Sequence, residues 1–161
     1  MLDYIAICKE LNGKRIKYIV VGGVAINSHG IPRMTYDLDF ILDLEDNNLE
    51  TFLKLVKSWG FKPRAPVDIM DFSKKEKRDK WIKDKNMKAF TLQNPEWAMS
   101  EIDIVINTPM DYEKAAINIK YVKIKNVSVP TISIDDLIKM KRQSNRQQDI
   151  ADIRNLRKLK K

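Results

Sequence analysis

The sequence predicts an α/β (α+β) domain with a mixed central sheet flanked by helices, and with short helices near the C-terminal end. Two observations predict this class. Segments with apolar residues at helical spacing alternate with short β-branched segments, and no Pro/Gly/Ser-rich linker or internal repeat divides the 161 residues. Because a chain of this length can bury one core, we expect a single domain over residues 1–161, with a helical extension at about residues 133–161.

The first half of the chain is expected to form three helices and two strands. Leu2, Ile5 and Leu11 recur at helical spacing, and the pair Asn12-Gly13 ends that helix. A β-branched segment follows and ends in two glycines, which is typical of a buried strand that enters a tight turn. The expected elements are helix 2–11, strand 16–21, helix 24–28, strand 37–42 and helix 49–59.

The second half is expected to complete the sheet and to end in helices. In residues 101–106 three isoleucines point to one face of a strand, while Glu101, Asp103 and Val105 point to the other. Ser133, three residues before Asp136, has the pattern of a capping box. The expected elements are strands 67–70 and 88–93 on either side of a Lys-rich helix, strand 101–106, a short helix at 115–116, strand 121–129, and helices 137–142 and 146–159, the last with its apolar face at positions 150, 153 and 156.

The composition excludes two classes of protein and favours certain ligands. Cys8 is the only cysteine, so a disulfide scaffold is excluded and a reducing, cytoplasmic location is expected. The longest apolar segment, residues 18–26, is too short to span a bilayer, so no membrane association is expected. The net charge is +8, and nine basic against two acidic residues lie in positions 139–161. Such a patch can bind nucleic acid or polyphosphate, or it can be a solvated helix face with a basic tail.

The glycine pair Gly22-Gly23 has the chemistry of a phosphate-binding turn. Glycines at the end of a strand let the backbone approach a ligand without a Cβ in the way, and the helix that follows offers free N–H groups. The alternative is an ordinary tight turn. The chain has neither a Gly-Lys-Ser/Thr phosphate loop nor a Gly-x-Gly-x-x-Gly fingerprint, so two large classes of nucleotide-binding site are excluded.

Three carboxylates point to a magnesium site. Asp37 and Asp39 are two residues apart on a strand, so both leave the same face. Asp103 projects from the isoleucine-rich strand and is placed to complete a two-ion site. Oxygen ligands of this kind suit Mg²⁺, which bridges to substrate phosphates. The alternative for each aspartate is a solvent-facing strand position.

In this order, Gly22, Gly23, Asp37, Asp39 and Asp103 resemble the signature of the DNA polymerase beta-like nucleotidyltransferase superfamily. The stretch from Gly30 to Asp39, with an Arg-x-Thr lead-in to the aspartates, is similar to minimal bacterial members and to the AbiEii-type toxins. The late segment from Asp136, with a Lys followed by Arg-x-x-Asp, is similar to the late helices of that group. The resemblance covers roughly residues 15–158.

The resemblance implies the nucleotidyltransferase fold and a Mg-dependent, two-metal reaction. It implies that Asp37 and Asp39 hold ions on the phosphates of a nucleoside triphosphate such as ATP. Asp103 then helps to hold the second ion and activates an acceptor hydroxyl, which attacks the α-phosphorus and expels pyrophosphate. The acceptor is left open between tRNA, a protein and a small molecule. If the chain is the toxin of a toxin–antitoxin pair, a cognate antitoxin is a further partner.

Two basic residues are expected to contact the triphosphate, namely Lys141 and, with less support, Arg33. The alternatives are a surface lysine and an ion pair between Arg33 and one of the aspartates. Lys139 and Lys141 do not share a helix face, so only one of them points inward. Arg146 and Asp149 are expected to pair and to lock the last helix. The alternative function is a non-catalytic nucleotide- or RNA-binding module with the same fold.

Overall fold

The computed structural model describes residues 3–97 and 101–160, and its centre is a seven-stranded sheet. The strand order is β3-β4-β5-β2-β1-β7-β6. The strands are β1 (Tyr18–Val21), β2 (Asp37–Leu42), β3 (Lys62–Pro63), β4 (Ala89–Gln93), β5 (Glu101–Val105), β6 (Lys120–Ile124) and β7 (Val127–Thr131). The sheet is mixed, as the sequence predicts, because β1 and β7 and also β2 and β5 run parallel while the other neighbours run antiparallel.

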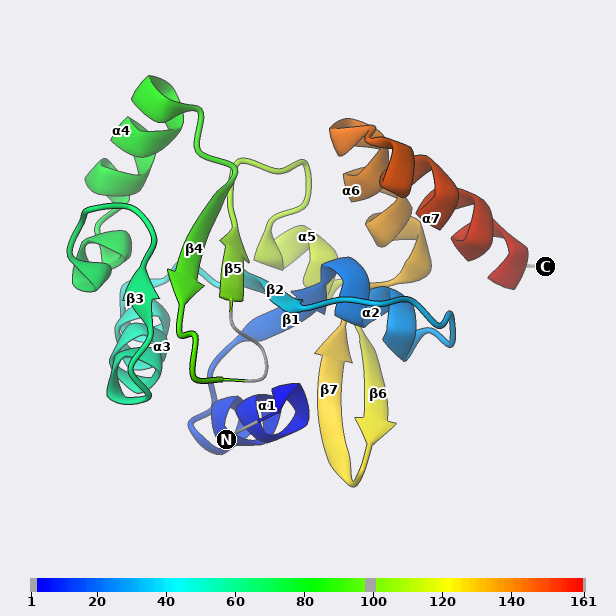
Figure 1. Cartoon of the computed structure of the whole chain (residues 1–161), viewed down its shortest axis with the longest axis horizontal. Coiled ribbons are helices and arrows are strands. Elements are labelled where there is room, and N and C mark those ends of the chain that lie inside the picture. Colours follow the sequence, from blue (N-terminus) through cyan, green and yellow to red (C-terminus); the bar gives the residue numbers. More distant parts are fainter. Residues whose placement is uncertain (1–2, 98–100, 161) are drawn as a thin grey trace.

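Seven α-helices and one 3₁₀ helix are present in the described part of the chain. They are α1 (Tyr4–Gly13), α2 (Gly22–Ser28), α3 (Asp46–Ser58), η1 (Ile69–Ser73), α4 (Lys75–Lys85), α5 (Tyr112–Ala116), α6 (Ile134–Ser144) and α7 (Gln147–Leu159). In Figure 1, α3 and α4 lie beside the β3–β4 end of the sheet, whereas α6 and α7 lie on the opposite side with the C-terminus. This arrangement confirms the predicted fold class.

One face of the sheet is apolar and is covered by α3, η1 and α4. Phe40 of β2 meets Phe52 of α3 edge to face, with ring centroids 6.1 Å apart. Phe90 of β4 stacks on Phe72 of η1 at 4.6 Å and on Trp81 of α4 at 5.6 Å. Trp81 thus fastens the Lys-rich helix to the core, although most of that helix is exposed.

Because side chains alternate along a strand, the opposite face of β2 and β5 receives the acidic residues. Parallel pairing places Asp37 beside Glu101 and Asp39 beside Asp103. Antiparallel pairing of β1 with β2 places Val21, the last residue before the glycine pair, beside Asp39. The topology therefore brings together motifs from three segments that are far apart in the sequence.

The helix starts follow local side-chain chemistry. Asp3 accepts a hydrogen bond from the Ala6 N–H at 2.9 Å and begins α1, and the predicted start of that helix at residue 2 lies outside the described residues. Ser133 accepts one from the Asp136 N–H at 3.2 Å and begins α6, which confirms the predicted cap.

The prediction of a strand at 67–70 is wrong. Ile69–Ser73 forms the 3₁₀ helix η1 instead. The Asp68 side chain accepts a hydrogen bond from the Met70 N–H at 2.8 Å and caps this turn, and Ile69 and Phe72 are buried beneath it. A capping aspartate and apolar residues three apart favour a helical turn, and these signals outweigh the β-branched residues just before it.

The prediction of one strand over 121–129 is also wrong, because the chain reverses within it. β6 and β7 form a hairpin around Lys125 and Asn126, both at positive φ (47° and 67°). Two residues at positive φ define the tight turn whose twist matches antiparallel strands. The hairpin extends away from the rest of the sheet in Figure 1.

The predicted strands 37–42, 88–93 and 101–106 and the two C-terminal helices are confirmed within a few residues. The predicted apolar face of the last helix is confirmed only in part, because Leu156 is buried while Ile150 is 48% exposed. Within residues 3–97 and 101–160, no helix combines the length and the apolar character needed to cross a bilayer.

Candidate active site

The turn between β1 and α2 lies directly against the Asp39 carboxylate. Gly22 has φ +66°, a conformation that favours glycine. A Cβ at this position would overlap Oδ2 of Asp39 and would lie 2.8 Å from its Cγ. Glycine is therefore required at position 22 both by the backbone conformation and by the close approach of the aspartate.

Gly23 is required for a different reason. A Cβ there would meet Nη1 of Arg33 and would lie 2.7 Å from Oγ1 of Thr35. The Arg33 guanidinium thus lies close to the backbone of the glycine turn at Gly23. The structure places both Gly22 and Gly23, and with them Arg33, around one turn.

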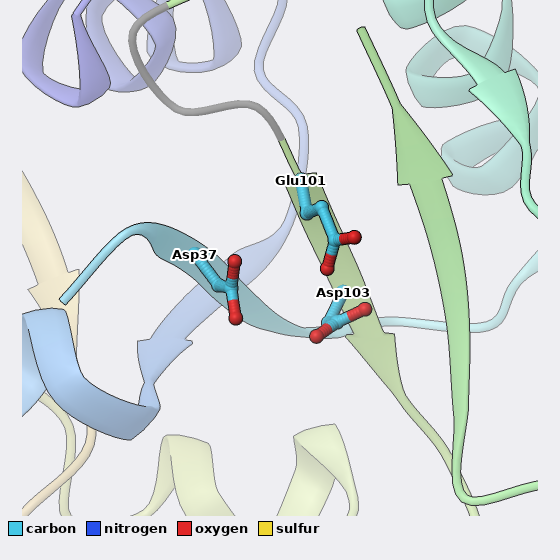
Figure 2. Close-up of side chains that lie close together, drawn as sticks. All are labelled: Asp37, Glu101 and Asp103. Carbon is cyan, nitrogen blue, oxygen red and sulfur yellow. The ribbon is translucent and has the colours of Figure 1, made fainter. Parts of the chain in front are cut away.

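Three carboxylates of β2 and β5 point toward one another (Figure 2). Oxygen atoms of Asp37, Glu101 and Asp103 all lie within 4.8 Å of one another. All three residues are partly buried. Asp39, the strand neighbour of Asp103, lies next to this group, and its carboxylate is directed to Gly22.

Burial and the neighbouring carboxylates raise the pKa values of Asp37 and Asp39. Burial, with the charges of Asp103 and Asp37, raises the pKa of Asp39 to about 7. Burial and the charges of Glu101 and Asp103 also raise the pKa of Asp37, and Arg64 offsets part of this. Burial is the larger cause for both groups, and the neighbouring negative charge, which nearby basic side chains neutralise only in part, adds to it.

Glu101 is a member of this group that the sequence analysis did not select. The Gln93 side-chain amide donates to its Oε1 at 3.0 Å and Arg64 donates to the same oxygen at 2.5 Å, and these hydrogen bonds lower the pKa of Glu101. The signal was present, because Glu101 is two residues before Asp103 and faces the same way on the strand. Asp103 is itself held by Thr91, whose hydroxyl donates to Oδ1 at 2.5 Å.

A cleft of about 560 Å³ lies next to Asp39 and Gly22. Its other walls include Asn107, which follows β5, Lys141 of α6, and Arg146 in the turn between α6 and α7. It joins one of the acidic residues, the glycine turn and basic side chains in a single depression. That volume is in the range of small-molecule and cofactor sites.

Lys141 reaches this cleft from within a buried ion network. Its Nζ lies 3.0 Å from Oδ2 of Asp152 and 3.3 Å from Oδ1 of Asp149. Asp152 also pairs with Arg33, whose Nε is 3.3 Å from Oδ1. Lys141 is only 6% exposed, whereas the side chain of Lys139 is 61% exposed and pairs with Asp136. Of these two lysines, Lys141 is thus the one that points inward.

Arg33 forms an ion pair, but its partner is Asp152 rather than Asp37 or Asp39, which were the partners considered from the sequence. Arg146 and Asp149 pair as predicted, with Nε and Oδ2 3.0 Å apart, and the Arg146 N–H also donates to Oδ2. The Asp149 carboxylate thus accepts the N–H of the residue that precedes α7 and helps to cap the start of that helix. The network therefore joins α6, α7 and the segment that leads into β2.

We expect Asp149→Asn to weaken the fold at neutral pH but not in strong acid. Burial alone would raise the pKa of Asp149, but hydrogen bonds from Arg146 and Ser144 and the charge of Lys141 lower it to about 2. A carboxyl with a lowered pKa stabilises the fold above pH 4 and loses that contribution as the pH falls toward 2. The free energy of unfolding of the variant should be about 2 kcal/mol lower than that of the wild type at pH 7.

Urea unfolding of both proteins at pH 7, 4, 3 and 2 checks this expectation. The matched control is Asp79→Asn, because Asp79 pairs with Lys75 on the surface of α4 and exposed pairs contribute little. If Asp149→Asn lowered the free energy of unfolding by the same amount at pH 2 and at pH 7, the expectation would be wrong.

Comparison with known proteins supports a fold and a family. A family model described as "Nucleotidyltransferase of unknown function (DUF6036)" matches residues 4–160. The chain belongs to this family. Its members are nucleotidyltransferases by that description, so the chain is a nucleotidyltransferase-family protein. No curated protein sequence matches it.

Solved structures show the same fold. A lincosamide antibiotic adenylyltransferase, LnuA, crystallised with lincomycin, is 14% identical with a TM-score of 0.66, covering 97% of this chain and 95% of its own. An antigenic nucleotidyltransferase-like protein from Paracoccidioides brasiliensis is 19% identical with a TM-score of 0.54, covering 94% of this chain and 72% of its own. A proposed nucleotidyltransferase from Thermotoga maritima is 12% identical with a TM-score of 0.54, and the match covers 94% of this chain and 86% of the Thermotoga protein.

Proposed function

We propose that this protein is a Mg²⁺-dependent nucleotidyltransferase that transfers a nucleoside monophosphate from a nucleoside triphosphate to an acceptor hydroxyl. The observation that supports it most directly is the convergence of Asp37, Asp39, Glu101 and Asp103 beside the glycine turn. A non-catalytic binding module of the same fold would not need four carboxylates where phosphates bind, since they repel phosphate unless cations lie between.

The residues fit divalent cations. All the donors are carboxylate oxygens, which Mg²⁺ prefers. Burial raises the pKa values of Asp37 and Asp39, and the neighbouring carboxylates raise them further, so a cation bound there would relieve both effects. Asp37, Asp39 and Asp103, with Glu101 beside them, would hold the metal. When bound, it would supply charge neutralisation on the phosphates and a lowered pKa of the attacking hydroxyl.

The chain's own residues would bind and orient the substrates. The Gly22-Gly23 backbone offers a surface without side chains, and in the cleft Lys141 and Arg146 provide positive charge for a triphosphate. Arg33 lies beside the same turn, next to Gly23. Thr91, by donating to Oδ1 of Asp103, fixes the direction of the carboxylate that would activate the acceptor hydroxyl.

The acceptor class that we favour within this proposal is a small molecule with a hydroxyl group. The support is that the lincosamide adenylyltransferase LnuA covers nearly the same length of chain in both directions. A tRNA or protein acceptor, and a role as the toxin of a toxin–antitoxin pair, remain predictions from the sequence motifs.

A transfer assay with label at two positions tests the proposal. The protein is incubated with Mg²⁺ and each nucleoside triphosphate, labelled at either the α- or the γ-phosphate, plus pools of total RNA, protein or small hydroxyl compounds. We expect α-label to enter one pool and γ-label to leave as pyrophosphate. A protein that neither transfers α-label nor binds any triphosphate contradicts the proposal, and transfer of γ-label would identify a kinase instead.

A further inference from the structure

The outer side of the α6–α7 pair carries a groove that is separate from the cleft. One hollow of about 590 Å³ is lined by Arg142, Arg154, Arg157 and Lys158 over Ile150 and Ile153. A second, of about 290 Å³, adjoins it and shares Arg142 and Arg157. We call the two together the outer groove. None of its lining residues lines the catalytic cleft.

The cations of the outer groove are mostly without acidic partners. Within the described residues, Arg142, Arg154, Arg157 and Lys158 form no ion pair, and all four are exposed. Its one acidic lining residue, Asp135, already pairs with Lys160. Most of the basic residues in positions 139–161 therefore line the outer groove rather than the cleft where a triphosphate would bind, and substrate binding does not account for them.

The floor of the outer groove is formed by apolar side chains that are not fully buried in the core. The apolar face of α7 reaches the core at Leu156, which is fully buried, but Ile150 is 48% exposed and Ile153 is only partly buried. Isoleucine side chains in a depression between two helices, with basic side chains along the rims, are the complement of a helix with one apolar and one acidic face.

We propose that the outer groove binds an acidic amphipathic helix of a protein partner. The groove lies between two helices of a helical hairpin, where a third helix packs its side chains into the groove. Apolar residues of the partner contact Ile150 and Ile153, while its carboxylates pair with Arg154, Arg157 and their neighbours. Nucleic acid fits less well, because the described lining residues include no aromatic side chain on which bases could stack.

Binding of synthetic probes tests the proposal on the intact protein. The first probe is a fluorescent helical peptide with Leu at positions i, i+3, i+4 and i+7 and Glu elsewhere. The second has the same composition but spreads the leucines around the helix, and the third is a single-stranded RNA oligonucleotide. We expect the first peptide to bind at least tenfold more tightly than the second, and more tightly than the RNA.

Variants locate the binding. The double change Arg154→Glu and Arg157→Glu should weaken binding of the first peptide at least tenfold, and Ile150→Glu should also weaken it at least tenfold. The matched control, Lys80→Glu with Lys83→Glu, makes the same charge change on exposed residues of α4 and should alter binding less than twofold. Melting temperatures confirm that each variant is folded.

Three results would overturn the proposal. The first is equal binding of the two peptides, which would show charge attraction alone. The second is tighter binding of RNA that the Arg154 and Arg157 changes abolish, which would identify a nucleic-acid surface. The third is no binding of either peptide. These measurements do not depend on nucleotide transfer, so they are unaffected if the proposed enzymatic activity fails.

Discussion

Asp39→Asn is expected to reduce nucleotide transfer by about 10³-fold or more, equivalent to about 4 kcal/mol of transition-state stabilisation. Asp39 is the carboxylate that lies both beside Asp103 and against the glycine turn. A neutral amide cannot supply the negative charge that a divalent cation requires there. The α-label assay measures the loss, and calorimetric titration with Mg²⁺ and triphosphate should show binding weakened in parallel.

The same variant should be more stable than the wild type when no metal is present. The pKa of Asp39 is raised to about 7 by burial, Asp103 and Asp37, so the carboxyl lowers the free energy of unfolding increasingly as the pH rises from about 4 to about 7, and this penalty is constant at higher pH. Asparagine removes this penalty. Melting temperatures in EDTA should therefore favour Asp39→Asn at pH 8, with a smaller difference at pH 5. A variant that loses activity because it is unfolded would show the opposite order.

Gly22→Ala is expected to lower transfer by at least about 10²-fold, because small displacements of a catalytic group have effects of this size. The new Cβ would overlap Oδ2 of Asp39 and force the carboxylate away from the turn. The φ of +66° adds about 1–2 kcal/mol of backbone strain for a residue with a side chain. Urea unfolding should show a loss of this order, and the labelled-transfer assay should show the larger loss in activity.

Gly13→Ala is the matched control for that change. Gly13 ends α1, and a Cβ added there meets nothing within 4 Å. Because alanine restricts the unfolded chain, this variant should be as stable as the wild type or slightly more stable, with unchanged transfer. If Gly22→Ala kept transfer within threefold of the wild type, the close packing of Asp39 on the turn would have no catalytic importance.

Much of the site was predictable because it depends on periodicity over short distances. Residues two apart on a strand share a face, and this places Asp37 with Asp39 whatever the rest of the fold does. The spacing of glycines after a strand likewise identifies the turn at Gly22. Asp103 was found from its position on the isoleucine-rich strand, and the family resemblance supported it.

The remaining features depend on partners that periodicity does not identify. Glu101 joins the carboxylates only because β5 pairs with β2 in one particular register, and Arg33 pairs with Asp152 only because α7 packs against the segment before β2. The hairpin of β6 and β7 was missed because its turn consists of Lys125 and Asn126, without a glycine. For Glu101 and Arg33 a contact between distant segments decides the outcome, whereas the hairpin depends on a local turn that lacks the usual glycine.

The ion pair between Arg33 and Asp152 also has a consequence for the order of assembly during synthesis. The carboxylates and the glycine turn belong to strands that can pair once residue 105 has been made, but Arg33 and Lys141 acquire their partners only when α7 is complete. A contact between residues more than a hundred positions apart forms late, since a long loop must close first. A nascent chain can therefore hold its acidic centre before it holds the basic side of the cleft, so the proposed contribution of Lys141 and Arg33 to triphosphate binding would be the last part of the site to form.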